Sequence, residues 1–430
     1  MIPIFDYKTQ PEEVKERLLS RSQTADESVQ GAVRAVLDAV QKRGDEALLE
    51  YTEKFDGVSM AAENLRVSEQ EIRQAYEQVD EQLLAVIRRA MDNIRAFHQK
   101  QKQNSWMDFD GNKAMGQMVR PIENVGVYVP GGTAAYPSSV LMNIIPAKVA
   151  GVSRIVMATP PQKDGSLYAP TVVAACEAGA DEIYKVGGAQ AIGALAYGTK
   201  TIRRVDKITG PGNVYVACAK REVFGVVGID MIAGPSEVLI IADESADAAC
   251  VAADLLSQAE HDLLAASVLL TTSKSLAEAV RREVQEQLEK LERRKIAEKS
   301  VTAHGAIVLV ESLHEAVALS DQIAPEHLEL AVEDPFPLLG FVKNAGSIFL
   351  GHYSPEPLGD YYAGPNHVLP TSGTARFSSG LTVDDFIKKS SVLYYGRSAL
   401  EDAREDVVRF AGSEGLTAHA NAINLRFKEE

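Results

Sequence analysis

The sequence predicts an α/β protein built on parallel β-sheets. From Val125 onward, short β-branched runs alternate with helical segments, and glycines mark the junctions between them. A second series of the same kind begins at "SEVLIIADES". Strand–turn–helix units in series form parallel sheets with helices on their faces. The length of 430 residues exceeds what one ordinary core supports, so two or more domains are expected.

The first hundred residues are expected to be mostly helical. From about Pro11 to Lys102 the chain is rich in Glu, Lys, Arg and Ala, and apolar residues recur at three- and four-residue spacing. The character changes after Trp106, the single tryptophan. The first series of strands follows at "VGVYVPGG", "SRIVMATP", "EIYKVGGAQ" and "DKITGPGN", with helices beginning near Ser138, Pro170, Ala191 and Val214.

The second series fills the following hundred residues. After "SEVLIIADES" we expect a helix over Ala246–His261, the strand "ASVLLTT", a charged helix from Ser275 to about Lys299, and the strands "GAIVLV" and "AGSIFLG". The stretch from Tyr353 to Ser379 is dense in Gly, Pro, Ser and Tyr and predicts a long ordered loop. A helical tail from about Ser398 closes the chain.

Composition and charge argue against some classes of binding partner. The net charge of −16 and the pI near 5.1 argue against nucleic acid or an anionic membrane as a partner. The start of the chain, "MIPIFDYKTQPEEV", lacks the basic and apolar regions of a signal peptide. No apolar stretch reaches the roughly 18 residues typical of a membrane span. We therefore expect a cytoplasmic protein.

Glycine-rich turns in the first series predict a nucleotide site. Ligands of open parallel sheets lie beyond the carboxyl ends of the strands, where three loops here carry glycines at 131–132, 187–188 and 210–212. The stretch "TGPGNVYV" departs from the G-x-G-x-x-G pattern, because Tyr215 occupies the third glycine position. Asp230 stands at a suitable spacing for a ribose hydroxyl. Tyr128, Gln190 and Asn213 lie at or near these turns and could contact a nucleotide.

One pair of residues suggests a metal site. Gln258 and His261 are three residues apart on a predicted helix, which puts both side chains on one face. Asp360 and His419 could complete a mixed oxygen–nitrogen sphere, which suits zinc and does not exclude manganese or cobalt. The remaining histidines are less informative, and His98, His304 and His314 are expected to be solvated.

The stretch "IAPEHLEL" places a carboxylate, Glu326, directly before an imidazole, His327. Consecutive side chains on a helix point about 100° apart, so in that geometry the two do not pair with each other. They could act as two separate bases. Taken alone, such a dipeptide is more often solvated surface.

Eight motifs together resemble the histidinol dehydrogenase family. In chain order they are "GVYVPGGTAAYPSSVLMN", "KVGGAQAIGALAYGT", "DKITGPGNVYV", "IAGPSEVLI", "LLSQAEHD", "IAPEHLEL", "PLGDYYAGPNHVLPTSGTARFSSGL" and "EGLTAHANAI". The resemblance covers essentially the whole chain. The block from Leu358 to Leu381 is the most specific, whereas the glycine turns alone are not specific.

The resemblance implies a fold and a reaction. The fold has two incomplete Rossmann-like parallel-sheet domains, a helical N-terminal segment, and a small helical tail that packs on the partner subunit of a homodimer. The implied parts are 1–25 (N-terminal helical segment), 26–124 with 237–380 (zinc and substrate domain), 125–236 (NAD-binding domain) and 381–430 (dimerisation tail). The implied reaction oxidises L-histidinol through L-histidinal to L-histidine with two NAD and one zinc ion per subunit. It completes histidine biosynthesis.

The resemblance also implies roles for individual residues. The catalytic pair falls on Glu326 and His327. The metal ligands fall on Gln258, His261, Asp360 and His419, and the NAD contacts on Tyr128, Gln190 and Asn213. Substrate contacts fall on Ser236 and Glu414, together with His327 and the four metal ligands. The sequence has the expected residue at each of these positions.

The two catalytic residues suit two different proton transfers. Histidine titrates near neutrality and can abstract protons as hydride leaves. A carboxylate in a dry pocket can activate the water that attacks an aldehyde. We therefore expect His327 to be the base of the oxidations and Glu326 to activate water. The cysteines, Cys176, Cys218 and Cys250, lie in alanine-rich helical patterns and are expected to be small buried hydrophobes, which disfavours a thiol adduct.

Three other functions are alternatives to that of a histidinol dehydrogenase. A dehydrogenase of the same fold could act on another amino alcohol or a polyol, which predicts changes at Ser236, Glu414 or the metal ligands. A non-catalytic zinc-binding or nucleotide-sensing relative predicts loss of Glu326 or His327. A scaffold protein leaves the glycine turns and the loop unexplained. The sequence shows none of these changes.

Overall fold

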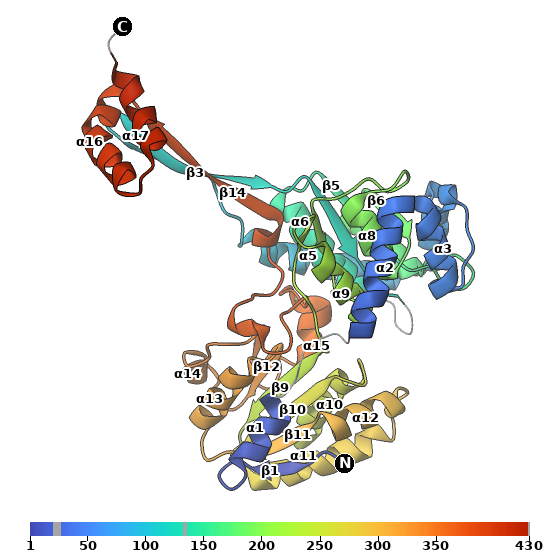
Figure 1. The fold of residues 1–430 in the computed structure, drawn as a ribbon. Helices are drawn as coiled ribbons and strands as arrows, with labels where there is room; N and C mark the ends of the chain where they lie inside the picture. Colours follow the sequence, from blue (N-terminus) through green and yellow to red (C-terminus); the bar gives the residue numbers. More distant parts are fainter. Residues whose placement is uncertain (20–26, 132–135, 429–430) are drawn as a thin grey trace. The chain divides into compact units, whose positions relative to one another are not determined.

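The computed structural model describes residues 1–19, 27–131 and 136–428. The chain divides into two compact units (Figure 1). The first consists of Met1–Gln101 and Ile122–Phe386, and the second of Lys102–Pro121 and Ile387–Glu430. Both parallel sheets belong to the first unit. The mixed α/β class with two parallel sheets, expected from the two series of strands, is confirmed.

A six-stranded parallel sheet contains the second series of strands. Its order is β1-β11-β10-β9-β12-β13. The strands span Ile4–Asp6 (β1), Glu237–Ala242 (β9), Ala266–Thr271 (β10), Ala306–Leu309 (β11), His327–Ala331 (β12) and Ser347–Leu350 (β13). Side chains alternate between the faces of each strand, so Val238 and Ile240 enter one apolar core and Leu239 and Ile241 enter the other. Both faces are buried, as parallel sheets require.

Helices cover both faces of this sheet among the described residues. They are α1 (Pro11–Leu19), α10 (Ala248–Ala259), α11 (Lys274–Leu288), α12 (Arg294–Ala303) and α13 (Leu313–Ile323). The expected N-terminal helical segment is present as α1, and β1 precedes it at the edge of the sheet. Residues 20–25 of that segment lie outside the described residues.

A five-stranded parallel sheet contains the first series of strands. Its order is β6-β5-β4-β7-β8. The strands span Asn124–Tyr128 (β4), Arg154–Thr159 (β5), Glu182–Lys185 (β6), Lys207–Thr209 (β7) and Gly228–Ile229 (β8). The helices that connect them are α6 (Pro137–Ala150), α7 (Ala169–Ala178), α8 (Gly188–Tyr197) and α9 (Val214–Val223). The carboxyl ends of β4, β6 and β7 carry the glycine turns.

Four N-terminal helices pack beside this five-stranded sheet. They are α2 (Glu27–Arg43), α3 (Asp45–Asp56), α4 (Glu69–Gln78) and α5 (Glu81–Gln99). α2 contacts α8 and α9, α4 contacts α7, and α5 contacts α6. The resemblance instead grouped residues 26–124 with the other sheet. The apolar faces of these helices are buried in the two cores that flank the five-stranded sheet.

The second unit combines a three-stranded antiparallel sheet with two helices. Strand β14 (Ile387–Tyr395) pairs with β3 (Lys113–Pro121) along its whole length, and β3 pairs with β2 (Trp106–Asp110). The helices are α16 (Arg397–Ser413) and α17 (Thr417–Asn424), followed by the 3₁₀ turn η5 (Leu425–Phe427). The helical tail was expected from the sequence, whereas this antiparallel sheet was not.

The glycine- and proline-rich stretch from Tyr353 to Ser379 is a loop with short helical turns. These are α15 (Glu356–Leu358), the π-helical turn η2 (Gly359–Ala363) and η3 (Thr374–Arg376). The Asn366 amide donates to the Met142 carbonyl at 2.6 Å and lies 3.4 Å from His98 Nε2. His98 is fully buried, so its expected solvation is wrong. A neutral imidazole can be buried when its nitrogens find partners.

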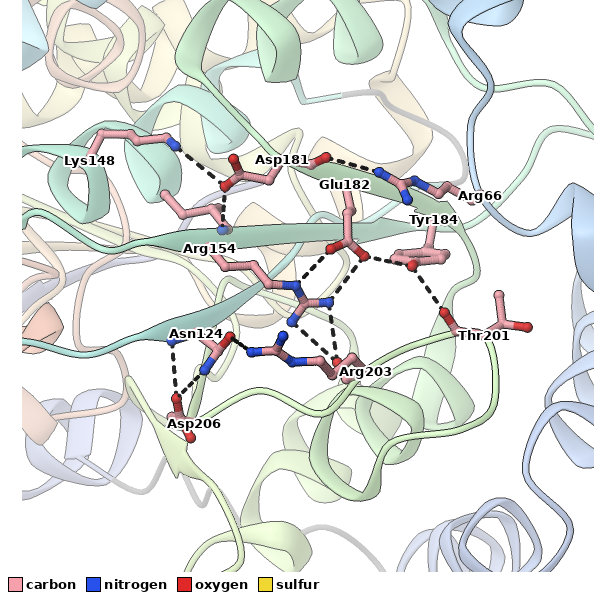
Figure 2. A network of polar contacts seen from close by, with 11 residues as sticks. Arg66, Asn124, Lys148, Arg154, Asp181, Glu182, Tyr184, Thr201, Arg203 and Asp206 are labelled. Atoms are coloured by element: carbon pink, nitrogen blue, oxygen red, sulfur yellow. Dashed lines mark hydrogen bonds and ion pairs between the residues drawn. The ribbon is translucent and has the colours of Figure 1, made fainter.

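A polar network joins the amino ends of the strands of the five-stranded sheet (Figure 2). Arg154 binds Glu182 through two contacts of 2.7 and 3.1 Å, and their side chains are only 13% and 17% exposed. The Tyr184 hydroxyl donates to Glu182 at 2.7 Å, and Arg203 donates to Asn124 at 2.8 Å. The Arg154 guanidinium lowers the pKa of Glu182. Arg154 and Glu182 begin β5 and β6, and Asn124 begins β4, so these contacts fix the strands at the end opposite the glycine turns.

No helix among the described residues has both the length and the apolar character needed to cross a membrane.

Candidate active site

Glu326 and His327 lie where the chain enters β12. Helix α13 ends at Ile323, Ala324 adopts a left-handed conformation with φ 53°, and Pro325 follows. The helical geometry expected for the Glu-His pair is therefore wrong, because α13 has already ended at Ile323 and the strand begins at His327. Both side chains are buried, at 5% and 3% exposure. Burial excludes the solvated-surface interpretation of this dipeptide.

Both side chains bind the same residue of the neighbouring strand. The Glu237 N–H donates to Glu326 Oε2 at 2.8 Å, and His327 Nδ1 lies 2.9 Å from the Glu237 carbonyl oxygen. The parallel register pairs His327 with Val238, which places Glu237 opposite the entry to β12. Because both side chains bind Glu237, His327 Nδ1 lies 3.8 Å from Glu326 Oε2. From the sequence, the two side chains were expected not to pair with each other.

The anchor fixes the tautomer of His327. A carbonyl oxygen can only accept, so Nδ1 must carry the proton and donate to Glu237. Nε2 is then the basic nitrogen of the neutral ring. It is buried without a hydrogen-bond partner and lies 3.7 Å from Asp360 Oδ1. A buried imidazole nitrogen without a partner is a group that can take a proton or bind a ligand.

The charges around the pair favour the proton-bearing forms. Burial raises the pKa of Glu326 to about 8, because the charged carboxylate loses its hydration. Burial alone would lower the pKa of His327, but the carboxylates of Glu326 and Asp360 raise it overall. Burial also opposes ionisation of Asp360, whereas its contact with His327 lowers the pKa of the acid. One acid and one base with shifted pKa values in a dry site are typical of acid–base catalysis.

Asp360 and Glu356 approach His327 from the loop. The turns α15 and η2 carry Glu356 and Asp360 four residues apart. One ligand atom from each of His327, Glu356 and Asp360 lies within 4.8 Å of the other two, a group suited to a metal ion. Burial raises the pKa of Glu356 to about 9. The sequence did not single out Glu356, although its spacing from Asp360 on a helical turn could have done so.

Gln258 and His261 come from the end of α10. Gln258 is in the last turn, and the His261 N–H bonds back to the Gln258 carbonyl at 3.2 Å. Gln258 is fully buried, yet both Nε2 and Oε1 lack a partner. Burial lowers the pKa of His261, against the opposing influence of the Asp360 carboxylate. A neutral imidazole and an unpartnered amide oxygen are both competent to bind a cation.

A second histidine, His367, supports Asp360. Its Nδ1 lies 3.0 Å from the Asp360 carbonyl, and its Nε2 lies 3.2 Å from the Ser139 hydroxyl. By the same argument as for His327, Nδ1 donates to the carbonyl and Nε2 accepts from Ser139. The sequence predicts no role for His367. Only the fold brings it beside Asp360.

Ser236 stands immediately before β9. It is half-buried, and its carbonyl accepts from the Ala266 N–H at 3.0 Å. It therefore precedes Glu237, the residue that anchors the Glu326–His327 pair. This site lies at the amino ends of β9 and β12, whereas the carboxyl ends are the usual place for a ligand in a parallel sheet.

The residues expected to contact NAD lie at the carboxyl edge of the five-stranded sheet. The Tyr128 hydroxyl, at the end of β4, accepts from the Gly188 N–H at 3.1 Å. Gln190 in α8 is 1% exposed, and both atoms of its amide lack a partner. Asn213 caps α9 by accepting from the N–H groups of Tyr215 and Val216 at 3.1 and 3.2 Å. Gly132 of the first turn lies outside the described residues.

Glu414 and His419 belong to the second compact unit of the chain, whereas the site residues described so far belong to the first. Glu414 follows α16 as its C-cap, and His419 lies in α17. Both are exposed. Within their own unit neither makes a contact that explains a catalytic role.

The cysteines are not activated nucleophiles. Cys218 is buried, Cys176 is partly buried and Cys250 is exposed, so the expected burial is wrong for Cys250. It lies in the first turn of α10, where the solvent-facing side of the helix is not determined by an alanine-rich pattern. Burial raises the pKa of both Cys176 and Cys250. A reactive thiol needs the opposite shift.

Comparison with known proteins matches almost the whole chain to one family. A profile described as histidinol dehydrogenase matches residues 19–427. The histidinol dehydrogenase of Caldanaerobacter subterraneus subsp. tengcongensis is 54% identical over 99% of both chains, and that of Bacillus cereus is 58% identical over 94% of both. The chain belongs to the histidinol dehydrogenase family. The crystal structure of histidinol dehydrogenase from Elizabethkingia anophelis has a TM-score of 0.93 and 39% identity, and covers 99% of this chain and 98% of that one.

Membership of the histidinol dehydrogenase family confirms the resemblance and the prediction of an oxidoreductase. It excludes a scaffold of unrelated fold. The roles of individual residues are a separate matter, because a family name assigns no atom to a step.

Proposed function

We propose that the protein oxidises L-histidinol through L-histidinal to L-histidine with two NAD⁺, as the last steps of histidine biosynthesis. The observation that carries this proposal is the tautomer of His327, whose basic Nε2 is buried beside Asp360 without a partner. Glu326 lies beside it on the same anchor. The site therefore holds two proton-transfer groups away from water, and His327 accepts a substrate proton when its Nε2 is unprotonated.

The reaction needs two hydride transfers and one hydration. The alcohol loses a hydroxyl proton and a hydride to give the aldehyde and NADH. Water then adds to the aldehyde, and the hydrate loses a proton and a hydride to give the acid and a second NADH. His327 Nε2 takes the hydroxyl proton in each oxidation. Its Nδ1–H remains bound to the Glu237 carbonyl, which stabilises the imidazolium.

Glu326 serves the hydration step. Its Oε2 accepts from the Glu237 N–H, and burial raises its pKa to about 8. A carboxylate with such a pKa can take a proton from water as the oxygen attacks the aldehyde. The first oxidation involves no water, so Glu326 is dispensable for it. The two residues thus divide the chemistry between them.

A zinc ion suits the buried and partly buried donors of the first unit. Gln258, His261 and Asp360 would hold it, with His419 of a second chain as the fourth ligand and Glu356 nearby. When bound, zinc would supply a positive centre that orients the imidazole and amine of the substrate. The carboxylates of Glu356 and Asp360 and the unpartnered Gln258 amide all favour a cation there. Ser236, Glu414 and the same ligands would contact the substrate.

NAD would lie on the turns of the five-stranded sheet. Gln190 offers a buried amide with no partner inside the protein, and Tyr128 and Asn213 stand on adjacent turns. A backbone approach to pyrophosphate at such turns is the common mode in parallel sheets. Asp230, suggested by its spacing as a ribose acid, is already bound to Gly210 and Lys220 and has no such role.

A homodimer would complete each site. The second unit exposes large apolar side chains, including Phe109 at 75%, Phe410 at 72% and Leu393 at 70%. Such a concentration of apolar surface on a small unit favours burial against another chain. We propose that Glu414 and His419 enter the active site of the partner subunit. The 33 residues from Ser398 onward are too few for a core of their own.

The first prediction separates the two catalytic residues. His327→Asn should slow oxidation of both histidinol and histidinal, because the base is lost. Glu326→Gln should slow mainly the oxidation of histidinal, by about 100-fold or more, since general base catalysis is lost only for hydration. Single-turnover NADH formation from each substrate measures this. Wild type should form two NADH per histidinol. Equal slowing of both half-reactions in Glu326→Gln would contradict the division of roles.

A second prediction uses two buried glutamines as matched controls. Gln258→Leu should lower the zinc content of the purified protein, while the metal-free variant unfolds at the same temperature as metal-free wild type or higher, because two buried unpartnered atoms are removed. Gln190→Leu removes an equivalent pair of atoms and should retain zinc but weaken NAD binding. Metal analysis and thermal unfolding measure both variants. Normal zinc content in Gln258→Leu would remove this residue from the ligand set.

The third prediction tests whether each site is shared between chains. His261→Ala and His419→Ala should each be inactive. In a heterodimer of the two, one site carries both defects and the other carries neither, so activity should return to about half of the wild-type value per dimer. The activity of a purified, differently tagged heterodimer measures this. An inactive heterodimer of confirmed composition would show that each site is built from one chain.

A further inference from the structure

An ion pair is buried beneath one of the nucleotide turns. Lys220 in α9 and Asp230 after β8 are in contact through Nζ and Oδ1, and their side chains are 2% and 0% exposed. Burying two opposite charges costs more solvation than a matched apolar pair. Such a pair contributes little net stability on average, so a specific structural role is the better explanation for it. The role is visible at Gly210.

Lys220 and Asp230 bind both peptide groups of Gly210. The Gly210 N–H donates to Asp230 Oδ2 at 2.8 Å, and Lys220 Nζ donates to the Gly210 carbonyl at 2.9 Å. Gly210 has φ 114°, a conformation that favours glycine. A Cβ there would lie 2.0 Å from the Tyr128 carbonyl oxygen. The turn is therefore pressed against the end of β4 and held there by two opposite charges.

The held turn leads directly to the start of α9. Asn213 follows Gly210 by three residues and caps the helix through the Tyr215 and Val216 N–H groups. Tyr128 links the same place to the neighbouring turn, because its hydroxyl accepts from the Gly188 N–H. A change in the backbone conformation at Gly210 would therefore move Asn213, the start of α9 and the contact with Tyr128. These are the groups on which the dinucleotide would rest.

We propose that Lys220 and Asp230 are positioning residues for NAD, acting through the peptide groups of Gly210 and touching no ligand themselves. This inference rests on the proposed nucleotide site. The spacing of Asp230 from Gly210 suggested a ribose contact, but both of its oxygens are bound within the protein. Its carboxylate shapes the turn instead. Variants of this pair should therefore lose affinity for NAD and not for histidinol, because histidinol would bind at the six-stranded sheet.

The test measures NAD and histidinol separately in the full-length dimer. Asp230→Asn keeps an oxygen for the Gly210 N–H but removes the charge that holds Lys220. The double variant Lys220→Met/Asp230→Asn removes both charges and leaves neither one buried alone. Each variant should raise the Kd and KM of NAD about tenfold, the effect of one hydrogen bond to a charged group. The KM of histidinol and kcat at saturating NAD should stay within twofold.

The pair Arg154–Glu182 supplies a matched control. It is also largely buried (Figure 2), and both residues begin their strands, whereas the turns follow the carboxyl ends of the strands. Glu182→Gln should lower the unfolding temperature without changing the Kd of NAD. If Glu182→Gln weakens NAD as much as Asp230→Asn does, loss of stability explains both, and the positioning role is wrong.

The Gln190→Leu variant separates failure of this inference from failure of the proposed site. If Gln190→Leu weakens NAD binding but both pair variants bind NAD normally, the site is correct and the positioning role is overturned. If Gln190→Leu also binds NAD normally, the nucleotide does not lie on these turns, and both proposals fail. Weaker NAD binding in Gln190→Leu and in the pair variants, with the control unchanged, supports both.

Discussion

The parallel pairing of β12 with β9 is the constraint on which the candidate active site depends. It places the peptide groups of Glu237 beside the entry to β12, and both Glu326 and His327 bind them. One residue thus orients an acid and a base at once. Because a carbonyl only accepts, the proton of His327 is confined to Nδ1 and the basic nitrogen faces Asp360. A shift of one residue in this register would turn His327 to the other face of the sheet.

Electrostatics explain why the site favours a cation. Within the described residues, Glu326, Glu329, Glu356 and Asp360 are brought together in the interior with Asp254. Burial raises the pKa of Glu329 to about 8 and of Asp254 to about 6, and the negative charge of Asp254 also raises the pKa of Glu329. The Glu356 N–H donates to Glu329 Oε1 at 2.7 Å. Protons, histidines and the proposed zinc ion are the means by which such crowded acids are stabilised.

The sequence predicted the sheets well because buried parallel strands are short apolar runs bounded by glycine. It predicted the position of the glycine turns for the same reason, since the carboxyl ends of β4, β6 and β7 follow from the order of the units. It missed β2, whose five residues are all exposed and so show no apolar alternation. It also misjudged His98 and Cys250, because burial of a single residue depends on packing between distant segments.

The spacing of residues in the sequence predicted less of the active site than of the sheets. Gln258 and His261 could be paired from one helical turn, but Glu356 and His367 meet Asp360 only because the loop folds back on itself. Helical geometry does not hold for Glu326 and His327, because α13 ends at Ile323 and β12 begins at His327. The residue roles came from the family resemblance. What the structure adds is a physical reason for them, the shared anchor at Glu237 and the unpartnered atoms of His327 and Gln258.

The tautomer of His327 is the most direct test of this account. Nitrogen-15 NMR of the protein labelled at histidine can follow the two ring nitrogens through titration, with His327→Asn identifying the signal. The account predicts that Nδ1 keeps its proton at every pH and that Nε2 alone loses its proton as the ring becomes neutral. A neutral ring with the proton on Nε2 would contradict it, because the nitrogen beside Asp360 could then accept no proton from the substrate.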